Sequence, residues 1–259
     1  MALYGAPIWA GRLNSKTRAL LRRPQRVIAQ RIIRGYKTIG HAAACALAGT
    51  IPWELDARLL AETYNQRTEL RIADERLAPR ELEARLDAEK KRARDRWKSQ
   101  LEDEPYGTYT VAALLTSFDS WLDRKSGTLT YRQVQVMTGH GCFGHYLYTI
   151  RREPSPVCHH CGYEDDTAYH TMVECPTWAP ERWELEMALN VDDLSLHNIV
   201  AKTIVSERSW AAFHNFCEKV MRKKEEAERA REARADAHPL RQRRRGVRRR
   251  QFVNALIPQ

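Results

Sequence analysis

Three cysteines and one histidine in the second half of the chain have the residue types and the spacing of a metal site. They follow the pattern C-x2-C-x8-H-x4-C and are Cys158, Cys161, His170 and Cys175. Zinc binds thiolate sulfur and imidazole nitrogen in a closed tetrahedron, and a two-residue gap lets two thiolates of one tight turn reach a single ion. Four such ligands leave no open position for a catalytic water. The sequence therefore predicts one structural Zn²⁺ rather than a hydrolytic centre.

Other interpretations of the cluster are weaker. Coincidence can bring three cysteines together in a chain that has six, but Gly162 after the second cysteine permits the left-handed turn that such a knuckle needs. A disulfide would require secretion, of which the sequence shows no sign. His159 and His160 are further imidazoles that could compete for the metal. We favour His170, because a short helix would present it together with the last cysteine.

Helices are the elements expected to position this site, because apolar residues recur along most of the chain at three- and four-residue spacing. Expected helices include the ranges 42–47, 80–102, 111–122 and 131–137, a helix that starts within 50–54 and continues until Pro79, and further helices between 181 and 222. The helix 80–102 is the clearest, and its narrow apolar stripe indicates pairing with the helix before it. His140 and His145 follow these helices in a glycine-rich loop, where we expect buried structural histidines.

The two ends of the helical pattern are less regular. Near the N-terminus, Ser15 is expected to cap a helix and Pro24 to open a second one. The apolar stripe of that second helix comprises Val27, Ile28, Ile32 and Tyr36. From Lys223 onward the pattern loses its apolar face, which predicts either a lone charged helix or disorder.

The net charge of +10 is concentrated at the two ends of the chain. Residues 1–40 hold nine Lys and Arg and no acid, and residues 241–259 hold seven Arg and no acid. Basic ends predict contacts with a polyanion, because arginines that neutralise phosphates release condensed counterions. The predicted phosphate contacts are Arg22, Arg23, Arg26, Arg241, Arg243, Arg244, Arg245, Arg248, Arg249 and Arg250.

Alternatives remain open for these basic residues. A disordered tail or a nuclear import signal explains residues 241–250 equally well, and a solvated helix face would explain the first block. Stacking of exposed bases on Tyr163 or Tyr169 is a further expectation.

No run approaches the roughly 18 apolar residues of a membrane span. No basic segment precedes the apolar residues 2–10, so we expect neither a secreted nor a membrane protein, with thiols reduced in cytosol or nucleus.

Several motifs resemble a family of mobile elements. In chain order they are Leu3 to Trp9, Gln25-Arg26, Gly35 to Thr38, Ala48-Gly49 with Pro52, Thr138 to Phe143, and the cysteine cluster that ends Glu174-Cys175-Pro176. These motifs resemble the C-terminal part of the polyprotein of arthropod type-1 non-LTR retrotransposons, which insert in ribosomal RNA genes. The resemblance implies a position just past the polymerase palm, in the thumb and connection region. It also implies a zinc knuckle that binds nucleic acid.

The resemblance places the catalytic carboxylates of the polymerase and of the endonuclease upstream of this chain, so we do not expect the chain to be active alone. Residues Tyr163 to Asp166 formally match the polymerase signature Tyr-x-Asp-Asp. We interpret this as a chance match, because that signature needs a hairpin between apolar strands. Here the four residues lie inside the loop 158–175 that carries the predicted ligands, which we call the metal loop.

The expected organisation is a mainly α chain of six segments. They are a thumb-like basic region (1–50), a charged helical linker (51–104), a helical region with the glycine-rich loop (105–150), the CCHC zinc knuckle (151–180), C-terminal helices (181–222) and a basic tail expected to be disordered (223–259). The predicted function is to hold RNA or DNA in the nucleus for target-primed reverse transcription by upstream polymerase and endonuclease domains. The alternatives are a zinc-stapled architectural or protein-interaction module, and a decayed element copy without activity.

Overall fold

The computed structural model describes residues 2–74 and 77–241, and these residues form helices and loops with no strand. The helices are α1 (Ala6–Trp9), α2 (Ser15–Ile32), α3 (His41–Ala48), α4 (Trp53–Ile72), α5 (Pro79–Glu102), α6 (Thr108–Leu115), α7 (Phe118–Asp123), α8 (Tyr131–Thr138), α9 (Gly144–Thr149), α10 (Ala179–Leu189), α11 (Leu196–Thr203) and α12 (Glu207–Ala233). Short 3₁₀ turns occupy Ala10–Arg12, Pro176–Trp178 and Pro239–Arg241, and a π-helical turn occupies His170–Glu174. The prediction of a mainly helical fold is confirmed.

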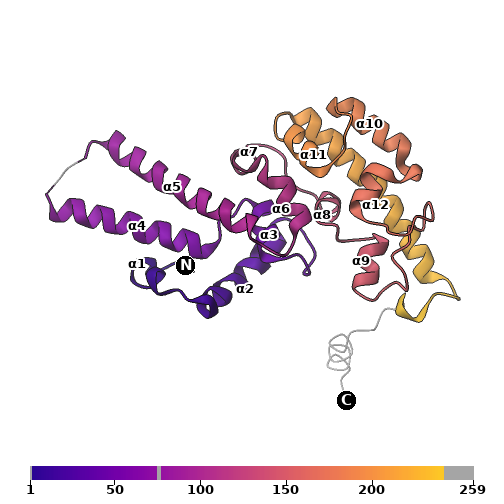
Figure 1. Ribbon diagram of the computed structural model, residues 1–259, viewed down its shortest axis with the longest axis horizontal. Coiled ribbons are helices and arrows are strands. Elements are labelled where there is room, and N and C mark those ends of the chain that lie inside the picture. Colours follow the sequence, from indigo (N-terminus) through magenta and orange to yellow (C-terminus); the bar gives the residue numbers. More distant parts are fainter. Residues whose placement is uncertain (1, 75–76, 242–259) are drawn as a thin grey trace, which may run out of the picture.

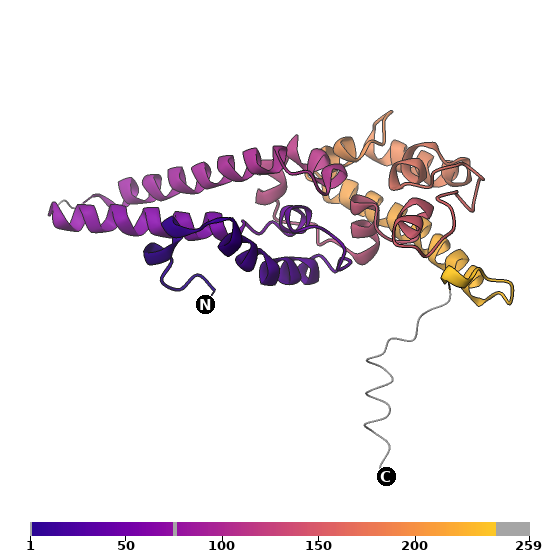
Figure 2. The same ribbon diagram turned by 60° about the horizontal axis from the view of Figure 1, so that its bottom comes forward.

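Two parts of different shape make up the described chain (Figure 1). Helices α4 and α5 form an antiparallel pair that extends away from the other helices, and we call this pair the arm. Helices α8 to α12 gather at the opposite end, with α6 and α7 between them and the arm, and we call residues 108–241 the body. Figure 2 shows the same division from another side. At the base of the arm, α1 packs on α4, α2 packs on α3, and α5 meets α6 of the body.

One hydrophobic core runs from the base of the arm through the body. It extends from Trp97 of α5 to Phe213 of α12, and it includes Cys158 and Cys175 of the predicted metal site. The rings of Trp97 and Phe118 meet edge to face, with centroids 4.9 Å apart. The metal loop is therefore built into the core rather than attached to it. Among the described residues, no helix is both long and apolar enough to cross a membrane.

The start of α2 differs from the prediction by one residue and by the role of its proline. Asn14 is the N-cap, because its Oδ1 accepts the Thr17 N–H at 3.0 Å, and Ser15 is the first helical residue. Pro24 lies inside α2 and does not open a second helix. A proline removes one intrahelical hydrogen bond, so the continuous helix depends on tertiary contacts on either side of it.

The predicted apolar stripe of α2 is wrong, because another face of the helix packs on α3 and α4. Val27, Ile28 and Ile32 are about half exposed, at 48%, 47% and 51%. The helix instead buries the face that carries Gln25 and Ala29. The Gln25 side chain donates to the Ile51 carbonyl at 2.8 Å and accepts the Trp53 N–H at 2.9 Å, so a buried polar residue is fully matched there.

The predicted helix 111–122 is two helices, α6 and α7, separated by a turn. Ser117 has a non-helical backbone, with φ −129° and ψ 31°. The break changes the direction of the chain, so that both Phe118 and Trp121 reach the core. Trp121 Nε1 then donates to the Ala46 carbonyl at 2.9 Å, which ties α7 to α3.

The arm has a buried seam only near its base. Ala93 and Trp97 are buried there, and Gln66 Nε2 donates to Glu89 Oε1 across the pair at 2.9 Å. Among the described residues of the ranges 60–74 and 77–88, none is buried. The pairing of α5 with the helix before it confirms the interpretation of its narrow apolar stripe.

The last turns of α12 differ most from the sequence-based expectation. The helix continues to Ala233 and packs on α8, α10 and α11. Lys224 and Glu228 are buried although both are charged. Lys224 pairs with Asp166, and Glu228 pairs with Arg231. The stretch from Lys223 to Ala233 is thus a charged helix, which was one of the two predicted alternatives, but it is not a lone helix, because partners outside the apolar pattern make burial of the charges possible.

Candidate metal centre and basic surface

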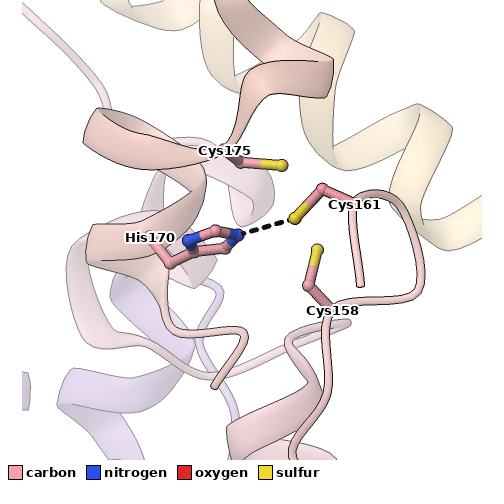
Figure 3. Close-up of side chains that lie close together, drawn as sticks. All are labelled: Cys158, Cys161, His170 and Cys175. Atoms are coloured by element: carbon pink, nitrogen blue, oxygen red, sulfur yellow. Dashed lines mark hydrogen bonds between the residues drawn. The ribbon is translucent and has the colours of Figure 1, made fainter. Parts of the chain in front are cut away.

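The four predicted ligands come together on one side of the metal loop (Figure 3). One ligand atom from each of Cys158, Cys161, His170 and Cys175 lies within 4.8 Å of all the others. Cys161 Sγ and His170 Nε2 are 3.3 Å apart. A tetrahedral site with Zn–S bonds of about 2.3 Å has ligand-to-ligand edges of about 3.5–3.8 Å. The group could therefore hold a metal ion after small movements of its side chains.

The first two cysteines are presented by a tight backbone turn. The Cys158 N–H donates to the Tyr163 carbonyl at 2.7 Å, and the Gly162 N–H donates to the Cys158 carbonyl at 2.8 Å. Gly162 has φ +82°, a conformation that side chains with a Cβ rarely adopt. This turn directs the Cys158 and Cys161 thiols toward the same point.

The other two ligands are placed by the π-helical turn. The Cys175 N–H donates to the His170 carbonyl five residues earlier at 2.7 Å, which is the hydrogen bond that defines a π-helix. A short helix was predicted here, but the structure has a wider turn than an α-helix. The wider turn suits the five-residue spacing, because it brings His170 and Cys175 to the same side of the chain.

The orientation of the His170 ring is fixed by its neighbours. Its Nδ1 faces Glu174 Oε2 at 3.2 Å, which leaves Nε2 for the metal. The Tyr163 ring stacks on the imidazole, with centroids 4.6 Å apart and an angle of 11° between the planes. A carboxylate behind a ligand imidazole selects its tautomer and raises its basicity. One face of Tyr163 is therefore occupied by the site itself.

The two neighbouring histidines are engaged elsewhere. His160 meets the Trp178 ring edge to face at 4.8 Å, and burial lowers the pKa of its imidazole to about 4. His159 Nε2 faces Glu153 at 3.3 Å and Arg241 at 3.2 Å. Neither histidine is part of the group that could hold a metal, whereas His170 is.

Burial also shapes the acid–base chemistry of the thiols. It raises the pKa of the Cys158 thiol to about 12 and raises the pKa of Cys175 as well. Without a metal these thiols stay protonated at neutral pH. A metal ion must displace the protons, because only the thiolate is a strong ligand.

A buried ion pair that no sequence pattern indicated joins the metal loop to α12. Lys224 Nζ lies 2.7 Å and 2.9 Å from the two carboxylate oxygens of Asp166, and both side chains are almost fully buried. Asp166 also accepts the Gly144 N–H at 2.9 Å and the Thr171 hydroxyl at 3.2 Å. Asp166, the last acid of the Tyr-x-Asp-Asp sequence, is thus surrounded by hydrogen-bond donors of the protein. This agrees with the interpretation of that sequence as a chance resemblance to the polymerase signature.

The glycine-rich loop packs directly against this region. A Cβ at Gly144 would lie 2.5 Å from the Pro156 carbonyl oxygen, so only glycine fits. His140 is half-buried, and burial lowers the pKa of its imidazole. His145 is exposed and lies 2.8 Å from Asp165, so the prediction of a buried histidine is wrong there. The carboxylate partner, remote in sequence, holds the ring at the surface.

The predicted phosphate contacts fall into different environments. Arg22 pairs with buried Glu54 at 2.6 Å, and Arg26 donates to the carbonyls of Lys37 and Ile39. Arg23 is exposed. Arg241 is not a free surface cation, because it is buried in an ion pair with Glu153. The remaining predicted contacts, Arg243, Arg244, Arg245, Arg248, Arg249 and Arg250, lie outside the described residues.

The end of α2 and the turn after it form a hollow of about 760 Å³, which we call the basic hollow. Its charged lining residues are Arg23, Arg26, Arg31, Arg34 and Lys37, and no carboxylate is among the described residues that line it. Two of these five residues, Arg23 and Arg26, were among the predicted phosphate contacts. The others were visible only as part of the acid-free block 1–40, because no local pattern showed which cations share a surface.

These features define a mainly helical protein with a buried Cys₃His group and a basic hollow. No protein-family model matches the chain, and no solved structure matches it. The chain is 29% identical over 165 residues to a retrovirus-related Pol polyprotein from the type-1 retrotransposable element R1 4 of Nasonia vitripennis, a match that covers 60% of this chain and 40% of that protein. It is 24% identical over 193 residues to the corresponding R1 3 polyprotein of the same organism, covering 70% and 50%.

The chain is therefore related to the Pol polyproteins of type-1 retrotransposable elements, as its motifs predicted. The matches span about half of the length of these relatives or less. The activities of a whole Pol polyprotein therefore do not follow for this chain from these matches.

Proposed function

We propose that this chain is a nucleic-acid-binding part of a retrotransposon Pol polyprotein. It holds RNA or DNA in the nucleus while polymerase and endonuclease domains of the same polyprotein carry out target-primed reverse transcription. The chain itself contributes binding and not the chemical step. The relationship to R1 polyproteins supports the context, and the basic hollow supports the binding.

The basic hollow is the observation that carries this proposal. Five cations line it, and Arg23, Arg31, Arg34 and Lys37 are all exposed. Phosphates that approach such a surface release condensed counterions, so binding is strong at low salt and falls steeply as salt increases. A solvated helix face would scatter its cations, whereas here they surround one concavity.

A charge-matched pair of variants tests the proposal. We expect the full chain to bind a 20-nucleotide single-stranded RNA, and the triple variant Arg23→Gln, Arg31→Gln, Lys37→Gln to bind it at least about tenfold more weakly at 50 mM salt. The control removes three exposed cations from the arm, through Arg80→Gln, Arg85→Gln and Lys91→Gln. Fluorescence anisotropy between 50 and 200 mM salt measures both. Equal weakening by the two variants, or no salt dependence in the parent chain, would refute a role for the hollow.

We further propose that Cys158, Cys161, His170 and Cys175 hold one structural Zn²⁺. Three thiolates and one imidazole match the preference of zinc, and four protein ligands fill a tetrahedral shell without an open position for a reacting water. Native mass spectrometry of the full chain, with and without a chelator, should show one zinc per chain. A chain that is folded and carries no metal would contradict this.

A second candidate function is an architectural or protein-interaction module in which zinc only staples the loop. The burial of Cys158 and Cys175 in the core favours it, because those ligands face the protein and not a partner. Cys161→Ser separates the two candidates, since Cys161 is the least buried of the four ligands. A folded variant that no longer binds RNA supports nucleic-acid handling. A parent chain that is folded, holds zinc and does not bind RNA supports the architectural module.

A further inference from the structure

A second hollow lies beside the basic hollow, where α2, α3 and α6 meet. It has a volume of about 590 Å³, and its lining includes Arg22, Arg26, His41, Tyr106, Tyr109 and His140. We call it the tyrosine hollow. Arg26 lines both hollows, so the two adjoining concavities share a positively charged residue. The volume is in the range of pockets that hold one small molecule.

One wall of the tyrosine hollow offers an exposed aromatic ring. Tyr106 precedes α6 and is 74% exposed, although it lines the hollow. The backbone after it is held tightly: Gly107 has φ +73°, and a Cβ there would lie 3.0 Å from the Ala43 Cβ. The tyrosine ring is therefore displayed on a fixed support, as a platform for stacking requires.

The lining of the tyrosine hollow also includes two guanidinium groups, those of Arg22 and Arg26, that are already in place. Arg22 is held through Nε and Nη2 by Glu54, and Arg26 is held through Nε and Nη2 by two backbone carbonyls. A guanidinium has five N–H donors, so each arginine keeps donors on its remaining nitrogen for a further acceptor. Such pre-oriented arginines suit a phosphate, which accepts charge-assisted hydrogen bonds.

The two histidines of the hollow are neutral near pH 7. Burial lowers the pKa of His41 to about 4 and lowers the pKa of His140. Neutral imidazoles can donate and accept hydrogen bonds at the edge of a base without adding charge. Glu104 also lines the hollow and sets a negative group at one side of it. The hollow thus combines two arginines, an exposed aromatic ring, uncharged polar groups and one carboxylate.

We propose that the tyrosine hollow seats one unpaired nucleotide of a single-stranded nucleic acid. The base stacks on Tyr106, the phosphate contacts Arg22 and Arg26, and the neighbouring phosphates continue over the basic hollow. A duplex does not fit this arrangement, because its bases are stacked on each other and cannot reach a side chain in a pocket. The inference rests on the proposed function and names the class of nucleic acid that this surface takes.

The test removes the aromatic platform from the full chain. We expect Tyr106→Ala to bind a 12-nucleotide single-stranded RNA about tenfold more weakly, since stacking of a base on an aromatic side chain is lost. Tyr106→Phe keeps the ring and should bind like the parent chain. The matched control is Tyr64→Ala, which removes a tyrosine that is 55% exposed on the arm. Binding of a duplex of the same sequence should be equal for all four proteins.

The outcomes distinguish this inference from the function on which it rests. A parent chain that binds neither single-stranded RNA nor single-stranded DNA overturns both. A parent chain that binds the single strand with salt dependence, together with Tyr106→Ala that binds equally well, overturns the tyrosine hollow alone. Equal losses for the single strand and the duplex in Tyr106→Ala also overturn it, because stacking requires an unpaired base. Circular dichroism confirms that each variant is folded.

Discussion

The outer half of α5 and the last turns of α12 have the same kind of sequence and opposite environments. Both carry dense charge of mixed sign and few apolar residues. In the arm, no described residue of the range 79–88 is buried, whereas in the body Lys224 and Glu228 are. The difference lies in the partners: α12 meets charges from loops that are remote in sequence, and the arm meets mainly water.

Two lysine pairs show what this difference means for stability. Lys90 lies 2.9 Å from Asp87 on the arm, and both side chains are more than half exposed. Lys224 lies 2.7 Å from Asp166 in the body, and both are almost fully buried. Exposed pairs contribute about 0–1 kcal/mol. Breaking one partner of a buried pair costs about 3–5 kcal/mol, because a charge is left without water or a counterion.

The largest effect should come from removing one residue of the proposed metal site. This site lies in the core of the body and not in the arm, so its loss should affect the two parts differently. We expect Cys175→Ser to lose the metal and the fixed packing of the body, while much of the helical signal of the arm persists. Structural zinc binds with about 10–16 kcal/mol in small domains, comparable to the whole stability of a domain. Near-ultraviolet and far-ultraviolet circular dichroism measure the two losses separately.

The control for this prediction is Cys142→Ser, which changes a half-buried cysteine outside the metal group. It should keep the metal and the near-ultraviolet signal. If Cys175→Ser melted like Cys142→Ser, the four-residue group would contribute no more to the body than an ordinary cysteine does.

The next effect compares the two lysine pairs directly. Lys224→Met should lower the free energy of unfolding by about 3–5 kcal/mol, because Asp166 keeps its charge in the core. Lys90→Met should change it by less than about 1 kcal/mol. Urea unfolding of both variants measures the difference. Adding Asp166→Asn to Lys224→Met should restore part of the loss, since the isolated charge is removed and the amide oxygen can still accept the Gly144 N–H. A double variant weaker than the single one would contradict this account.

How far the sequence could predict these features depends on how local their causes are. The Cys₃His group that could hold a metal was predicted because its spacing and the turn at Gly162 are local. The helix 80–102 was found because its apolar stripe repeats with the helical period. The buried face of α2 was not found, because burial of Gln25 depends on the carbonyl of Ile51 and on the Trp53 N–H. The burial of Lys224 likewise depends on a residue 58 positions away.

A smaller effect on stability, one that depends on pH, is expected from the neutral imidazole of His41. Burial lowers the pKa of His41 to about 4, below the value near 6.5 of an unfolded chain. The unfolded state therefore binds the proton more readily, so this contribution to stability is complete above about pH 7 and is lost as the pH falls through 6.5 toward 4.

Because His41 retains some contact with solvent, we expect a loss of about 2 kcal/mol between pH 7 and pH 4. Urea unfolding at several pH values measures this slope. His41→Gln should reduce the slope, whereas His197→Gln, at an exposed position, should leave it unchanged. An equal slope in the parent chain and in His41→Gln would show that other groups cause the acid sensitivity.

The smallest effect tests whether geometry alone can make an exposed pair strong. Arg94 of α5 forms a two-pronged contact with Asp123 of α7, with distances of 2.9 Å and 2.6 Å, and it holds the pKa of that carboxyl below its usual range. Both side chains remain exposed, so we expect a coupling energy of only about 0.5 kcal/mol, which should vanish at 1 M salt. A double-mutant cycle with Arg94→Gln and Asp123→Asn measures it. A coupling as large as that of Lys224 and Asp166 would mean that contact geometry, and not burial, separates the arm from the body.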